Sequence, residues 1–276
     1  MNSAQQSDRL AELLTILNLE QVEENLFRAF HPKDRERRLY GGQIMAQALM
    51  AAFNTVPERL HAHSLHGYFL RPGDPKTPAV IKVQRLRDGR SFSARRVVVV
   101  QHGEAIFSMD CSFQISEEGP QHQVDNPRPD IKPPAEDKIP DYLYDSAFIT
   151  WQHNFRRLHD FTPQPPEQFV WFKANGEVPA DLRLQTCLLV YESDNTLIST
   201  ARLPHRGKFD RDKMQVASLD HAMWFHHQVK VDEWHLYAQD APSTSSGRGI
   251  SRGLIYNAQG VLVASTMQEG LIRVHE

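Results

Sequence analysis

The sequence predicts an α+β fold built from two similar units, each with a long buried helix wrapped by a curved antiparallel sheet. A repeat is the first observation behind this prediction: in each half, a mostly apolar helical stretch precedes several alternating strands that turn residues separate. The second observation is a proline-rich stretch between the halves that contains few apolar runs. We therefore predict an N-terminal unit at residues 1–116, a connection at residues 117–167 and a C-terminal unit at residues 168–276.

The N-terminal unit is expected to hold the first of the two buried helices. Residues 40–53, YGGQIMAQALMAAF, are apolar almost all the way round a helix, which is typical of a buried one. Gly41 and Gly42 allow another backbone to approach its N-terminus, where free N–H groups and the helix dipole favour an electron-rich oxygen. A surface helix with leucines at positions 10, 13, 14 and 17 precedes it, and strands are predicted at residues 63–70, 80–87, 92–101 and 105–114.

The C-terminal unit repeats this order of elements. A second mostly apolar helix is predicted at residues 179–192, with Pro179 suited to its first turn. Residues 215–226, QVASLDHAMWFH, are predicted to form one strand that matches residues 63–70. Setting Gly260 against Gly103 aligns the last two strands of each half and places Arg252 against Arg95.

The same alignment draws attention to Gln268. In the first half, Met109 and Cys111 lie on an apolar strand face that should point toward the helix, and Thr266 and Gln268 take their places in the second half. An amide on a core face needs hydrogen-bond partners. The residues alone leave open whether Gln268 ties the strand to a helix end or serves a functional site.

Two other polar residues near the second helix have equally ordinary explanations. Ser218 begins a strand, where a serine hydroxyl commonly bonds to backbone, and Asp194 follows the helix, where an aspartate commonly bonds within its own turn. Ser218 and His221 invite a serine-nucleophile interpretation, but residues three apart on one strand point to opposite faces, and no GxSxG motif is present.

Other classes of site are disfavoured. The histidines at 61, 63 and 66 lie outside any HExxH or CxxC pattern, so structural or surface roles are expected for them and no metal site is predicted. No Walker motif occurs, and the Gly-Arg-Gly at residues 247–249 is too short for a dinucleotide loop. We therefore predict a site that uses neither a metal nor a nucleotide cofactor.

Composition limits the compartment and the partners. A net charge of −3 gives no electrostatic basis for binding nucleic acid or an anionic membrane. No apolar run is long enough to span a bilayer, and the N-terminus lacks the basic region and apolar run of a signal peptide. Cys111 and Cys187 both lie in apolar surroundings, which predicts buried free thiols and a cytoplasmic location.

Several long motifs resemble the acyl-CoA thioesterase II family of the TesB type. They are YGGQIMAQAL, HSLHGYFLRPGD, RDGRSFSARRVVVVQ, SLDHAMWFH, GRGISRG and VLVASTMQEGLIR, and the resemblance runs from the first helix to the C-terminus. It implies a double hotdog fold, in agreement with the repeat. It also implies hydrolysis of medium- to long-chain fatty acyl-CoA to free fatty acid and CoA without a cofactor, by a homo-oligomer, either a dimer or a tetramer.

The resemblance also implies which residues are catalytic. The family places an Asp, a Ser or Thr and a Gln around an attacking water, and these match Asp194 in VYESD, Ser218 in VASLDH and Gln268 in STMQEG. All three belong to the C-terminal unit, and Asp220 is not the family's aspartate. We expect Asp194 to act as general base, with the other two holding the water. A backbone N–H near Gly42 is the expected oxyanion donor.

The substrate is expected to need an apolar slot and a few cations. Met45, Leu49, Met223, Trp224 and Phe225 are the candidates for the acyl slot. The candidates for the cations that bind CoA are Arg71, Arg90, Arg95 and Arg248.

Two alternatives remain open from sequence: a non-catalytic acyl-CoA-binding hotdog protein, and a hotdog hydratase or dehydratase. Enzymes of the second kind usually pair a catalytic histidine with a carboxylate, and no such pair lies at the matched positions. A mere binder has no need for all three residues of the predicted site.

Overall fold

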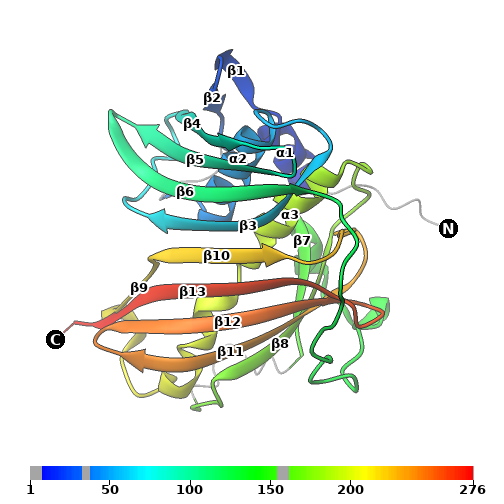
Figure 1. The fold of residues 1–276 in the computed structure, drawn as a ribbon. Helices are drawn as coiled ribbons and strands as arrows, with labels where there is room; N and C mark the ends of the chain where they lie inside the picture. Colours follow the sequence, from blue (N-terminus) through cyan, green and yellow to red (C-terminus); the bar gives the residue numbers. More distant parts are fainter. Residues whose placement is uncertain (1–7, 33–37, 154–161, 276) are drawn as a thin grey trace.

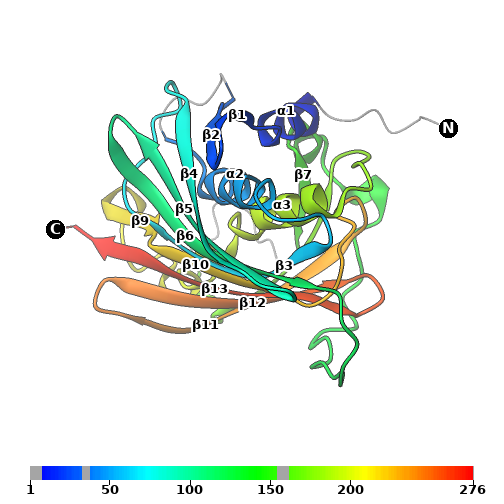
Figure 2. The same cartoon turned by 45° about the horizontal axis from the view of Figure 1, so that its top comes forward.

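The computed structural model describes residues 8–32, 38–153 and 162–275, and its main feature is a single curved sheet. Thirteen strands within the described ranges form this sheet, and each pairing between neighbouring strands is antiparallel. The helices α2 (Gly41–Phe53) and α3 (Leu182–Ser193) lie together on its concave side, as Figure 2 shows. The predicted α+β arrangement of two buried helices wrapped by sheet is therefore confirmed.

The first half of the chain forms one side of the sheet (Figure 1). Its outer elements are α1 (Asp8–Leu17), β1 (Glu20–Glu23) and β2 (Leu26–Ala29). The meander after α2 consists of β3 (Leu60–Phe69), β4 (Ala79–Asp88), β5 (Phe92–Gln101) and β6 (Glu104–Ile115). In α2, all but two of the helical residues are buried, which is why its sequence is apolar on every side.

The second half forms the other side of the sheet. Its strands are β7 (Phe148–Gln152), β8 (Glu167–Ala174), β9 (Met214–Ser218), β10 (Asp220–Phe225), β11 (His235–Ser245), β12 (Arg248–Asn257) and β13 (Leu262–Val274). A short helix, α4 (Leu197–Thr200), packs on β11, β12 and β13. The helix α3 begins at Leu182 rather than at Pro179, because the Asp181 carboxylate caps it by accepting hydrogen bonds from the N–H groups of Arg183 and Leu184.

The two halves join where β3 pairs with β10 at the centre of the sheet (Figure 1). Each of these strands also has a partner from its own half, β6 and β13 respectively. Neither half therefore exposes a strand edge at the junction.

The stretch predicted as one strand at residues 215–226 is two strands, β9 and β10. Ser218 lies opposite Gly270 on β13, whereas Ala222 lies opposite Met267, so four steps along one strand match three along the other. Leu219 is the extra residue of this bulge. One extra residue reverses the alternation of side chains, and it turns Ser218 to the same inner face as Gln268. The prediction that Ser218 and His221 point to opposite faces was therefore wrong.

The alignment of Arg95 with Arg252 was also wrong by one residue. His102 and Gly103 alone connect β5 to β6, both with positive φ, whereas residues 258–261 connect β12 to β13. The longer second loop shifts the register, so Arg95 lies opposite Cys111 while Ser251, not Arg252, lies opposite Gln268. Arg95 accordingly points into the core, and Arg252 points outward.

The proline-rich connection contains more regular structure than the sequence predicts. Short 3-10 helices occupy Glu136–Lys138 and Asp141–Asp145. The strand β7 follows and pairs with β8 at the edge of the sheet. Within the described part of the chain, no helix combines the length and the apolar character that crossing a membrane requires.

Candidate active site

The amide of Gln268 joins three side chains from different elements. Its Nε2 donates to Asp194 Oδ1 over 2.6 Å and to Ser218 Oγ over 3.2 Å. These two bonds use both hydrogens of the amide, so the Ser218 hydroxyl keeps its own hydrogen for another acceptor. Gln268 Oε1 is buried and has no hydrogen-bond partner among the described residues. The cluster therefore offers one carboxylate, one free hydroxyl hydrogen and one free amide oxygen.

Asp194 lies where the two buried helices meet. It is the C-cap of α3, and the N-terminus of α2 approaches it so closely that a Cβ on Gly41 would lie 2.6 Å from Asp194 Oδ2. A Cβ on Gly42 would lie 2.2 Å from the carbonyl oxygen of Tyr191. The glycines are thus required for this approach. A carboxylate at the negative end of α3 is unfavourable, and the positive end of α2 offsets that effect.

His221 lies behind the carboxylate and is fully buried. Its Nδ1 is 3.9 Å from Asp194 Oδ1, and its Nε2 is 3.0 Å from Ser193 Oγ. Burial lowers the pKa of His221, and the charge of Asp194 opposes that shift. The sequence did not assign His221 to the site, because the bulge at Leu219 that brings it to the same face as Ser218 has no local sequence signal.

Tyr237 on β11 holds the last turn of α3 against the sheet. Its hydroxyl donates to the carbonyl oxygen of Ser193 over 3.1 Å and lies 2.8 Å from Thr266 Oγ1. Burial raises the pKa of Tyr237, so the phenol stays protonated and keeps its hydrogen for this bond. Tyr237 therefore fixes the backbone carbonyl of Ser193, the residue that precedes Asp194.

A second buried carboxylate, Glu192, belongs to the same turn of α3 but contacts β7. Its Oε1 accepts from Thr150 Oγ1 over 2.7 Å and from Asn195 Nδ2 over 3.0 Å. Burial raises the pKa of Glu192 to about 7, while the two hydrogen bonds act in the opposite direction. No hydrogen bond links Glu192 to Gln268 or Ser218 among the described residues.

Comparison with known proteins identifies the family. A family model described as acyl-CoA thioesterase matches residues 145–271, and one described as acyl-CoA thioesterase N-terminal domain matches residues 31–114. Acyl-CoA thioesterase 2 of Haemophilus influenzae is 38% identical over 98% of this chain and 100% of its own length. The chain belongs to the acyl-CoA thioesterase II family.

Other relatives of this thioesterase agree. Acyl-coenzyme A thioesterase 8 of Homo sapiens is 39% identical, with 94% of this chain and 88% of that protein covered. The crystal structure of acyl-CoA thioesterase II TesB2 from Mycobacterium marinum is 41% identical, with 96% and 98% of the two chains covered and a TM-score of 0.82. The chain is therefore an enzyme that hydrolyses acyl-CoA thioesters, and its fold is the double hotdog.

The residues predicted for the acyl slot of the thioesterase divide between two faces of the sheet. Met45, Leu49 and Met223 are buried on the inner side, and Phe225 packs against the same core. Trp224 points outward and is 45% exposed, because neighbouring residues of β10 alternate between faces. It therefore does not share a slot with the others.

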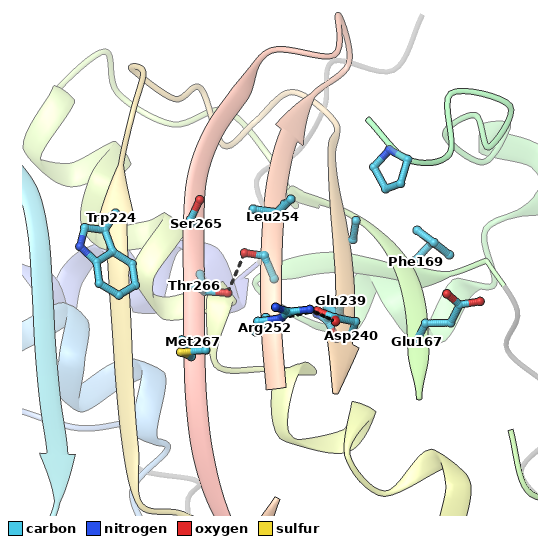
Figure 3. A pocket seen from close by; sticks show the side chains of 13 residues that line it. Glu167, Phe169, Trp224, Gln239, Asp240, Arg252, Leu254, Ser265, Thr266 and Met267 are labelled. Carbon is cyan, nitrogen blue, oxygen red and sulfur yellow. Dashed lines mark hydrogen bonds and ion pairs between the residues drawn. The ribbon is translucent and has the colours of Figure 1, made fainter. Parts of the chain in front are cut away.

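Trp224 instead lines a pocket of about 530 Å³ on the outer face of the sheet (Figure 3). Phe169 and Leu254 contribute apolar surface there, and the ion pair between Arg252 and Asp240 crosses one side. Asp194, Ser218 and Gln268 are not among the residues that line this pocket. It is therefore separate from the three-residue cluster.

Of the four arginines predicted to bind CoA, Arg95 is excluded by its burial. Its guanidinium is wholly inside the protein, where it donates to Thr55 and forms an ion pair with Asp88. Arg90 is exposed, whereas Arg71 and Arg248 are half-exposed and pair with glutamates. These three stay available as surface cations.

Two of the three histidines on β3, His63 and His66, contact side chains of other types. His66 pairs with Asp220 over 2.9 Å on the outer face, and the ring of His63 contacts the ring of Phe92. In the described ranges, no group of three or more His, Cys, Asp or Glu side chains could hold a metal ion.

Proposed function

We propose that this thioesterase hydrolyses medium- to long-chain fatty acyl-CoA by direct attack of a water molecule that Asp194, Ser218 and Gln268 hold. The observation that carries the proposal is the convergence of these three side chains through the Gln268 amide. A thioester carbonyl is already electrophilic, so water can attack it without a covalent enzyme intermediate. Fixing the water in attack geometry contributes up to about 7–11 kcal/mol in favourable cases.

Each group then has one role in the proposed reaction. The water oxygen bonds to the thioester carbonyl carbon as Asp194 takes one of its protons. The tetrahedral intermediate collapses, the C–S bond breaks, and the sulfur of CoA takes the proton back from Asp194. Gln268 Oε1 is free to accept the second hydrogen of the water, and the Ser218 hydroxyl is free to donate toward the reacting centre.

The oxyanion of that intermediate is expected to face the first turn of α2. The N–H groups of Gly42 and Gln43 lie there without intrahelical acceptors, and the close contact of Gly41 with Asp194 brings this turn to the carboxylate.

The acyl chain is expected to extend along the inner face beside Met45, Leu49 and Met223. Methionine side chains are flexible and re-pack readily, which supports acceptance of medium to long chains. We further propose a cytoplasmic homo-oligomer, a dimer or a tetramer, that acts in fatty acid metabolism. The free thiols of Cys111 and Cys187 support the compartment, and the exposed Trp224 supports an interface on the outer face.

Thiol release from a chain-length series of acyl-CoAs tests the residues and the substrate range together. We expect release by the wild type to depend on chain length and to fall about 100-fold or more in Asp194→Asn, because the general base is lost. Asp110→Asn is the matched control, since this exposed aspartate on β6 forms an ion pair with Arg96 and, among the described residues, has no hydrogen bond to Asp194, Ser218 or Gln268. Activity that survives Asp194→Asn would overturn the residue assignment.

The same assay separates the alternatives. The 3.9 Å approach of His221 to Asp194 is the kind of histidine–carboxylate pair that a hydratase would use. Hydration or dehydration of an acyl-CoA leaves the thioester intact, as does mere binding, so neither releases thiol. Folded wild-type protein that consumes an unsaturated acyl-CoA without thiol release would favour the hydratase alternative.

A further inference from the structure

His221 faces the proposed catalytic cluster although none of the proposed roles uses it. Ala222 on β10 lies opposite Met267 on β13, so the next position on each strand places His221 across from Gln268 on the inner face. The histidine is fully buried, and its Nδ1 is 3.9 Å from the same Asp194 oxygen that accepts the Gln268 amide.

The contacts of Ser193 suggest which nitrogen of His221 carries hydrogen. Ser193 Oγ lies 2.9 Å from the carbonyl oxygen of Val190, which can only accept, so we assign the hydroxyl hydrogen to that bond. With this assignment, the 3.0 Å contact between Ser193 Oγ and His221 Nε2 uses the hydrogen of the histidine. In the neutral ring this leaves Nδ1 with a lone pair that faces Asp194, and Nδ1 has no hydrogen-bond partner among the described residues.

This arrangement affects the two states of Asp194 in opposite ways. When Asp194 is ionised, two acceptors face each other, which is unfavourable. When Asp194 has taken a proton, its O–H can donate to Nδ1, and closing the gap by roughly 1 Å brings the pair into hydrogen-bond range. We propose that His221 is a positioning residue that acts through Asp194, with Nδ1 accepting a hydrogen bond from the Asp194 carboxyl group after that group has taken a proton from the attacking water.

The charged groups around His221 are consistent with a neutral ring. Asp194 at the end of α3 and Asp220 on β10 favour its charged form, whereas His66 on β3 and burial oppose it, and burial has the largest effect. The facing residue of β13, Gln268, is uncharged, and the hydroxyl of Tyr237 on β11 is a neutral group bonded to the Ser193 carbonyl. His221 therefore keeps its lone pair at neutral pH.

Two substitutions distinguish the roles of the two ring nitrogens of His221. The amide nitrogen of His221→Gln reaches the place of Nε2 and can donate to Ser193, but it leaves no acceptor toward Asp194. The amide oxygen of His221→Asn occupies the place of Nδ1 and keeps that acceptor, but it loses the donor to Ser193. If His221 had only a structural role, the loss of kcat in each variant would follow its loss of thermal stability.

The measurement is the pH profile of kcat and kcat/KM for thiol release by wild type and both variants, with Tm beside it. We expect His221→Gln to lower kcat about tenfold at neutral pH, with KM within about twofold, and to move the acid limb to lower pH. His221→Asn should keep the wild-type acid limb. An acid limb that is the same in all three proteins, or kcat losses that simply follow Tm, would overturn the proposal.

Because the inference rests on the proposed function, its failure must be distinguishable from failure of that function. Loss of the wild-type acid limb in Asp194→Asn shows that the limb reports Asp194, and an Asp194→Asn enzyme as active as wild type would refute the proposed function instead. If the His221 variants do not fold, ¹⁵N NMR of the wild-type histidine rings decides the matter. We expect His221 to be the Nε2–H tautomer near neutral pH, and a ring protonated at Nδ1 would overturn the proposal.

Discussion

Replacing Glu192 with glutamine should change how the stability of the thioesterase depends on pH. Burial raises the pKa of Glu192 from 4.5 to about 7 in the folded protein. Below pH 4.5 the carboxyl is protonated in both the folded and the unfolded state, so Glu192 does not make the free energy of unfolding depend on pH there. Between pH 4.5 and 7 the folded state binds more protons than the unfolded state, so stability falls as pH rises.

The size of the effect follows from the pKa shift. A shift of one pKa unit corresponds to roughly 1.4 kcal/mol. Ionisation of the buried Glu192 carboxyl should therefore lower the free energy of unfolding by about 3 kcal/mol, and this loss is complete above pH 7. The glutamine side chain of Glu192→Gln would stay neutral at every pH, and its amide oxygen can accept the same hydrogen bonds from Thr150 and Asn195. Glu192→Gln should therefore be more stable than wild type above pH 7, and the advantage should shrink toward pH 4.5.

Urea unfolding of wild type and Glu192→Gln at intervals from pH 5 to pH 8 measures this difference. Histidines whose pKa values burial lowers, such as His31 and His221, also make stability depend on pH, but they are shared by both proteins and cancel in the difference. Glu118→Gln on the exposed connection is the control and should show no such trend. A stability difference that stays constant from pH 5 to pH 8 would refute the reasoning.

Two further substitutions test the packing around the site. Gly41→Ala would bring a methyl group within 2.6 Å of Asp194 Oδ2 and 2.9 Å of the Phe69 ring, so thiol release should fall more than about tenfold. Gly119→Ala, with nothing within 4 Å of the added methyl, should leave activity unchanged, and equal activities in the two variants would contradict the close approach of α2. Arg95→Met should cost about 1–3 kcal/mol of unfolding free energy, because it leaves the hydroxyl and carbonyl oxygens of Thr55 without their buried donor, whereas the half-exposed Asp88 carboxylate can turn to water. A loss below about 1 kcal/mol in urea unfolding would show that these contacts contribute little.

The parts of the fold that the sequence predicts are those with a regular spacing of apolar residues. The two buried helices stand out because they are apolar on every side, and their strands because inward and outward residues alternate. The same alternation predicts that Gln268 faces the core, and the structure buries it completely. The partners of Gln268 came from the resemblance, because Asp194 and Ser218 have ordinary roles at their own positions.

What the sequence does not predict depends on single-residue shifts between strands. The bulge at Leu219 and the longer loop before β13 each move one side chain to the other face of the sheet. Strand register is set by partners that are distant in sequence, so neither shift has a local pattern. The first shift hid the approach of His221 to Asp194, and the second led to the wrong alignment of Arg95 with Arg252.

The inward turn of Arg95 has a consequence for stoichiometry. The first half of the chain has a place equivalent to the proposed catalytic cluster, at the C-terminal end of α2 and beside Cys111, where the second half has Asp194 and Gln268. The Arg95 guanidinium fills that place by bonding to Thr55. With the proposed cluster as the reaction centre, the described residues hold one such centre, in the second half, and each polypeptide should turn over one acyl group at a time. The first half then serves as framework, with a buried guanidinium at the equivalent place.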